Sequence, residues 1–126
     1  MTRSRASAKA AGARFERLIA DALAQHVDDR IDRRVKTGAA DKGDIAGLRL
    51  SDGSKVVAEL KDYGGALKVG PWLNEAAKER INDDALAAIV VAKRRGTTNP
   101  LDQIVFCTLA DLIAIITHQR PEETQP

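Results

Sequence analysis

The chain has 126 residues, of which 44% are hydrophobic and 30% charged, and its formal net charge is +2. This length suits one compact domain, and the composition argues against wholesale disorder. No apolar run is long enough to cross a bilayer, no secretory signal peptide is recognisable, and the single cysteine, Cys107, cannot form an internal disulfide. We therefore expect a cytoplasmic protein without structural zinc.

The first third of the chain predicts a helix and a short strand. Residues 1–13 combine basic and small side chains, which is typical of a flexible arm. From 15 to 26, apolar residues recur at the spacing of one helix face. Alternation over 31–35 then predicts an edge strand, followed by a loop of small and charged residues at 36–43.

The clearest local signal is a β-hairpin. Two strand-like runs, 44–51 and 54–61, flank the pair Asp52-Gly53. Such a pair favours a tight two-residue turn. The turn sets the register of the two strands, and the register sets which side chains share a face.

In that register Asp44 lies opposite Lys61, and Ala46 lies opposite Glu59. Because direct partners share a face of the sheet, Asp44, Glu59 and Lys61 are expected on one side. Asp44 then lies diagonally from Glu59, roughly 7–8 Å away between backbones and within reach of a shared ion.

The second half predicts a helix, two strands and a closing helix. Proline suits the first turn of the helix predicted at 72–84. The apolar run 86–92 is typical of a buried strand, and 101–107 and 109–116 follow as a strand and a helix. The order is therefore α-β-β-β-α-β-β-α, an α/β domain over 14–118 with a frayed polar tail at 119–126.

Two acids and a lysine at the end of a hairpin suit metal-assisted hydrolysis. Carboxylates with waters are the ligands that Mg²⁺ and Mn²⁺ prefer. Such a metal lowers the pKa of a bound water, and Lys61 can stabilise the developing negative charge. Glu16, at the edge of the first helix's apolar stripe, is a candidate to complete the site. The alternative is a solvated cross-strand charge cluster that binds nothing.

These residues resemble the signature of the PD-(D/E)xK nuclease superfamily. Gly43-Asp44-Ile45 matches the first part of the signature, with Gly43 in place of the proline, and Glu59-Leu60-Lys61 matches the second. The first half more narrowly resembles the archaeal-type Holliday junction resolvases, and the resemblance extends to about Ala92. The residues that carry this narrower resemblance are Gly12, Glu16, Arg17, Leu18-Ile19, Lys36, Thr37-Gly38-Ala39-Ala40 and Asp44.

The resemblance implies a restriction-endonuclease-like core with a central mixed β-sheet of about five strands flanked by helices. It implies that Asp44, Glu59 and the backbone carbonyl of Leu60 bind Mg²⁺, for which Mn²⁺ can substitute. Lys61 would be the catalytic lysine, and Glu16 the helix-borne acid that helps to hold metal or water.

The sequence departs from these relatives at two points. Many members of the superfamily have a glutamine on the helix after the lysine, where this chain has Asn74, Glu75 and Lys78. Relatives often carry a catalytic serine in the loop before the aspartate, where this chain has Ala39-Ala40, and Thr37 is a candidate substitute.

Basic residues near Asp44 are expected to contact DNA phosphates. The candidate DNA contacts are Arg33, Arg34, Lys36, Thr37, Lys42, Lys68 and Lys78.

The favoured function is a Mg²⁺-dependent endonuclease that cuts four-way DNA junctions by phosphodiester hydrolysis. The resemblance implies a homodimer, whose two-fold symmetry would match that of the junction. The alternatives are a repair, restriction-like or flap nuclease, and a catalytically silent DNA-binding module. Neither a membrane nor a nucleotide cofactor is expected.

Overall fold

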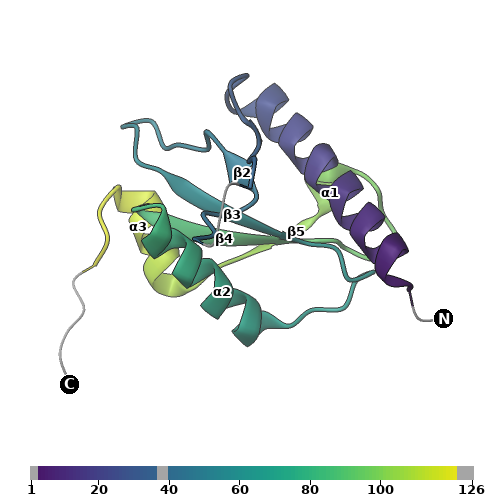
Figure 1. The fold of residues 1–126 in the computed structure, drawn as a ribbon. Helices are drawn as coiled ribbons and strands as arrows, with labels where there is room; N and C mark the ends of the chain where they lie inside the picture. The colour runs from purple at the N-terminus through teal and green to yellow at the C-terminus, as the bar shows by residue number, and fades with distance from the viewer. Residues whose placement is uncertain (1–2, 37–39, 122–126) are drawn as a thin grey trace.

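The structure, a computed structural model, describes residues 3–36 and 40–121. It is an α/β protein whose helices and strands follow the predicted order, with one short 3-10 turn, η1, added before the last strand (Figure 1). The elements are α1 (Arg5–His26), β1 (Asp32–Arg33), β2 (Ile45–Ala46), β3 (Val56–Lys61), α2 (Val69–Asn82), β4 (Ala87–Ala92), η1 (Pro100–Asp102), β5 (Ile104–Phe106) and α3 (Leu109–Thr117). No helix among the described residues is long and apolar enough to cross a membrane.

The five strands form two sheets. β1 and β2 make a short antiparallel pair, and the main sheet has the order β3-β4-β5. β4 lies in the centre, parallel to β3 and antiparallel to β5, so the main sheet is mixed as predicted. The single central sheet of about five strands is not observed. The segment around β2 is joined to β3 by separate bonds, from the Asp44 amide to the Ala58 carbonyl and from the Val56 amide to the Leu48 carbonyl, and not by a continuous ladder.

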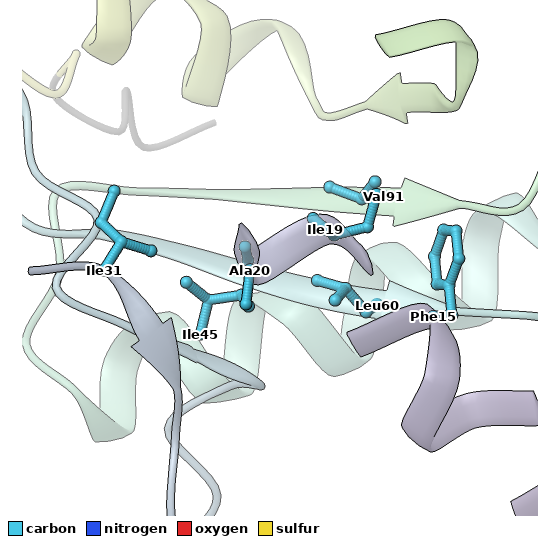
Figure 2. Packing of buried hydrophobic residues seen from close by; sticks show 8 residues of the cluster. Phe15, Ile19, Ala20, Ile31, Ile45, Leu60 and Val91 are labelled. Carbon is cyan, nitrogen blue, oxygen red and sulfur yellow. The ribbon is translucent and has the colours of Figure 1, made fainter. Parts of the chain in front are cut away.

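Helices α1 and α2 cover opposite faces of the main sheet (Figure 1). Successive side chains of a strand point to opposite faces, so β3 supplies both layers. Leu60 packs with Phe15 and Ile19 of α1, as Figure 2 shows. Val57 packs on the other face with Trp72 of α2. Glu59 and Lys61 are two and four residues after Val57 on β3, so their side chains point to the same face as Val57, the face that α2 covers.

The first helix begins much earlier than predicted. α1 starts at Arg5, so the flexible arm expected at 1–13 is wrong over most of its length. The Ser4 side chain accepts a hydrogen bond from the Ser7 amide at 3.1 Å and caps the helix. The segment is rich in alanine, which has the highest helix propensity, and this outweighs its lack of a wide apolar stripe.

The predicted hairpin register is also wrong. The Leu50 amide donates to the Ser54 carbonyl at 2.8 Å, so the loop has three residues, not two. Gly53 closes it with φ +89°, a conformation that glycine adopts without strain. A second positive φ at Gly47 shifts the pairing further, and Asp44 comes to lie opposite Ala58 instead of Lys61.

The Asp111 side chain links α3 to the main sheet by hydrogen bonds. Its buried carboxylate accepts hydrogen bonds from the Ala88 amide of β4 at 3.2 Å, from the Thr108 hydroxyl at 2.8 Å and from the Arg120 guanidinium at 2.7 Å. Burial opposes ionisation, but these donors outweigh it and lower the pKa of Asp111. The start of the predicted frayed tail is thus anchored by Arg120, while 122–126 lie outside the described residues.

We expect Asp111→Asn to lower the free energy of unfolding by about 1–3 kcal/mol at neutral pH, because it weakens bonds to buried donors. Since folding lowers the pKa of Asp111, its contribution is complete above the ordinary aspartate pKa, about 4, and is lost as the pH falls through the folded value. The difference between wild type and variant should therefore shrink in acid. Urea unfolding over a pH series measures it, with the exposed Asp84→Asn as control. A difference that stays constant with pH would contradict this assignment.

Candidate metal centre

Asp44, Glu59 and Lys61 come together at the end of β3, despite the shifted hairpin register. Asp44 immediately precedes β2 and is 4% exposed. One of its carboxylate oxygens, Oδ2, accepts from the Leu60 amide at 2.9 Å, and Oδ1 accepts from Lys36 Nζ at 2.8 Å. The bond to Leu60 holds the Asp44 carboxylate beside the strand that carries Glu59. The structure thus places three of the four predicted catalytic residues on neighbouring segments. The carboxylates close enough to one another to share an ion are those of Asp41, Glu59 and Glu79, a group without Asp44.

Helix α2 adds a buried acid that the sequence analysis missed. Glu79 is 2% exposed, and carboxylate oxygens of Asp41, Glu59 and Glu79 all lie within 4.8 Å of one another. Glu79 is seven residues after Trp72 and three after Ala76, on the buried face of α2. A charged residue at an apolar position of the helical pattern was the signal that would have found it.

The buried acids lack donors. Among the described residues, three carboxylate oxygens have no hydrogen-bond partner: both oxygens of Glu79 and Oε2 of Glu59. Burial raises the pKa of both groups, and the negative charge of Asp44 raises both further. Without a cation the pair is therefore best satisfied by a proton shared between Glu59 and Glu79.

Lys61 lies between two glutamates. Its Nζ is 3.4 Å from Oε1 of Glu59 and 2.7 Å from Oε2 of Glu75 on α2. Burial alone would lower the pKa of Lys61, but the bond to Glu75 and the charge of Glu59 outweigh it and raise the pKa. Lys61 is therefore an ammonium ion at neutral pH, suited to stabilise negative charge and not to accept a proton.

The structure does not bring Glu16 into this acid group. Glu16 lies on α1, across the sheet from α2, and its carboxylate accepts a hydrogen bond from the Arg33 guanidinium at 3.2 Å. The predicted role for Glu16 as a metal ligand therefore has no support in the geometry. Leu60 pairs with Val91 in the β3–β4 ladder. Its contact with the site is the hydrogen bond that its backbone amide donates to the Asp44 carboxylate.

The predicted DNA contacts have different surroundings. Arg34 is partly buried and bonds Asp83 and the Ile45 carbonyl, both at 3.3 Å, which indicates a structural role. Lys68 lies 5.4 Å from the centre of the Tyr63 ring. Lys42 and Lys78 are exposed, Arg33 and Lys36 pair with Glu16 and Asp44, and Thr37 lies outside the described residues.

A groove of about 610 Å³ has more basic than acidic lining residues, and one of them, Lys36, bonds Asp44. Its acidic lining residues are Glu16 and Asp32. Its walls come from α1 and from the segment around β1, and its cationic lining residues are Lys9, Arg17, Arg33, Arg34 and Lys36. A second hollow, of about 570 Å³, adjoins it at Gly12 and is lined by Arg3 and Lys61. Lys9, Arg17 and Arg3 are not among the predicted DNA contacts. Lys9 and Arg17 lie on α1, and Arg3 lies just before it.

A scan of protein-family models, a search of curated proteins and a search of solved structures each found no significant match to this chain. What the protein does is therefore inferred from its own residues.

Proposed function

We propose that the protein is a divalent-metal-dependent DNA endonuclease. The observation that supports this most is the group of buried acids beside a protonated lysine: Asp44 and Glu59 with Lys61 at the end of β3. Two carboxylates can hold Mg²⁺ or Mn²⁺, and an ammonium next to them can stabilise a phosphoryl oxygen during hydrolysis.

The group of neighbouring carboxylates formed by Asp41, Glu59 and Glu79, here called the acid group, suits a hard cation. Oε2 of Glu59 and both oxygens of Glu79 are buried with no donor among the residues that the structure describes, so a cation would supply the partner that they lack. When bound, Mg²⁺ activates a water and neutralises charge on the phosphate. The protein's own part is to orient these carboxylates and to hold Lys61, through Glu75, beside the reacting phosphate.

The substrate we propose is DNA, because cations outnumber acids in the groove between α1 and the segment around β1, where five basic residues accompany Glu16 and Asp32. Lys9, Arg17 and Arg33 line it, and Lys36 joins it to Asp44. Such a lining contacts phosphates and carries little base specificity. Binding should therefore weaken steeply as the salt concentration rises.

We further propose the narrower identity that the sequence resemblance implies, a Holliday junction resolvase with a restriction-endonuclease-like core, acting as a homodimer in the cytoplasm. Gly43 has φ +93°, and a Cβ there would lie 2.8 Å from Cγ1 of Val57. Proline, with φ near −65°, does not fit this conformation, which gives a physical reason for the glycine in the signature. Exposed apolar side chains gather on β5 and α3 and support a subunit interface there. They are Val105, Leu109, Leu112, Ile113 and Ile116.

Cleavage of a panel of DNA substrates tests this function. A labelled four-way junction, a flap, a linear duplex and a single strand are incubated with the protein in Mg²⁺ or in EDTA. We expect paired, symmetric cuts in the junction that require Mg²⁺. If the linear duplex is cut as fast as the junction, the resolvase assignment fails and a repair, restriction-like or flap nuclease replaces it. If no substrate is cut but the junction is bound, the protein is a DNA-binding module instead.

A further inference from the structure

Glu79 is a buried carboxyl group with no basic partner in the part of the chain that the structure describes. It lies on the inner face of α2, 2% exposed, and within 3–36 and 40–121 neither of its carboxylate oxygens has a hydrogen-bond partner. Its carboxylate is aimed at two others, because oxygens of Glu79, Glu59 and Asp41 lie within 4.8 Å of one another. Three acids at this distance repel one another unless a cation or a proton lies between them.

The loop that carries Asp41 is fixed toward the same point. Asn82, at the end of α2, donates its side-chain amide to the Asp41 carbonyl at 2.7 Å. The Asp41 carboxylate accepts from the Gly43 amide at 2.9 Å, which sets the turn leading into Asp44. One helix therefore supplies Glu79 and also holds the loop that supplies Asp41.

The cations nearby are already engaged. Lys61 lies within 3.4 Å of Oε1 of Glu59 and bonds Glu75, but it leaves Oε2 of Glu59 without a partner. Lys36 bonds Asp44. Among the described residues, then, no lysine, arginine or histidine pairs with Glu79, so in the absence of a bound cation the pair Glu59–Glu79 depends on a shared proton.

The donor set selects the class of ion. All three ligands are carboxylates, and hard divalent cations such as Mg²⁺, Mn²⁺ and Ca²⁺ prefer oxygen ligands, whereas zinc sites usually include histidine or cysteine. Metal–oxygen distances of about 2.0–2.6 Å place two ligands of one ion at most about 5 Å apart. The separations among the three acids therefore match a single shared ion.

We propose that a divalent cation binds among Asp41, Glu59 and Glu79, and that Glu79 on α2 is the helix-borne acid of the metal centre. This takes the place predicted for Glu16, which lies across the sheet and pairs with Arg33. The inference rests on the proposed function only for the use made of the ion, since the ligand set follows from the fold. Helix α2 then has two tasks, holding the ion through Glu79 and Lys61 through Glu75.

Mn²⁺ titration calorimetry on three proteins tests the proposal: wild type, Glu79→Gln and Glu16→Gln. The two substitutions are chemically identical, and each removes one helix-borne carboxylate. We expect Glu79→Gln to weaken Mn²⁺ binding by about ten-fold or more, and Glu16→Gln to bind as wild type does. Unchanged binding in Glu79→Gln, or a larger loss in Glu16→Gln, would overturn the proposal.

Thermal unfolding followed by circular dichroism separates a lost ligand from a lost fold. In EDTA, Glu79→Gln should melt at or above the wild-type temperature, because it removes a buried charge. The same Mn²⁺ concentration should raise the wild-type melting temperature and raise that of Glu79→Gln less. An equal Mn²⁺-dependent rise in both proteins would overturn the proposal.

The same proteins distinguish this inference from the proposed function. Mn²⁺ binding that depends on Glu79, in a protein that cuts no DNA, would keep the metal site and reject the nuclease. Cleavage by wild type with undiminished Mn²⁺ binding in Glu79→Gln would keep the nuclease and reject this ligand.

Discussion

Replacing Lys61 with alanine should reduce the rate of Mg²⁺-dependent DNA cleavage by about 10²–10³-fold, while Mn²⁺ still binds. The expected loss is that of a group stabilising charge in the transition state. Metal binding should persist, because the substitution removes a positive neighbour of Glu59 and leaves every carboxylate of the acid group in place. Single-turnover cleavage of the junction and a Mn²⁺ titration measure the two effects separately.

Lys55→Ala is the matched control. Lys55 immediately precedes β3, at the end of the strand opposite Lys61. Lys55 bonds the carbonyl of Asp83, and Asp83 keeps Arg34 as its second partner, so the variant should fold. We expect its cleavage rate to match that of wild type. Equal rates in Lys61→Ala and Lys55→Ala would exclude a catalytic role for Lys61.

Replacing Trp72 with alanine should lower the free energy of unfolding by about 3–5 kcal/mol, the usual cost of emptying a buried aromatic site. Trp72 is 3% exposed and fills the core between α2 and the main sheet. Its ring centroid lies 5.0 Å from that of Tyr63 and 6.3 Å from that of Phe106 on β5. The loss is a large fraction of the stability of an ordinary domain.

Urea unfolding measures this effect. Trp72 is the only tryptophan, so circular dichroism must replace tryptophan fluorescence as the probe. Tyr63→Ala serves as the comparison, because Tyr63 belongs to the same aromatic group but is 50% exposed, and its loss should cost about 1 kcal/mol. If both substitutions cost the same, Trp72 does not hold α2 against the sheet as we describe.

The order of the elements was predictable because it depends on local patterns. Apolar spacing in α1 and the unbroken apolar run of β4 each identify one element without knowledge of its neighbours. The division of the strands into two sheets was not predictable in this way. It depends on positive φ angles at Gly47 and Gly53, which shift the hairpin pairing, and the Asp-Gly pair does not encode this shift.

The candidate site was predictable only where it lies on one hairpin. Asp44, Glu59 and Lys61 are close in sequence, and the amide of Leu60 keeps Asp44 beside β3 even in the shifted register. Glu16 and Glu79 lie outside the hairpin, on helices α1 and α2. The helical pattern marks Glu79 as a charge at a buried position. Which face of β3 each helix covers decides that Glu79 reaches the acids and that Glu16 does not, and the pattern does not report this.

The most direct test of the central claim is the position of a bound ion. A crystal of the protein soaked in Mn²⁺ is measured at a wavelength where manganese scatters anomalously. We predict an anomalous difference peak between the carboxylates of Glu59 and Glu79, close to Lys61. A map with no peak at these carboxylates in a crystal that holds Mn²⁺ elsewhere would contradict the metal centre.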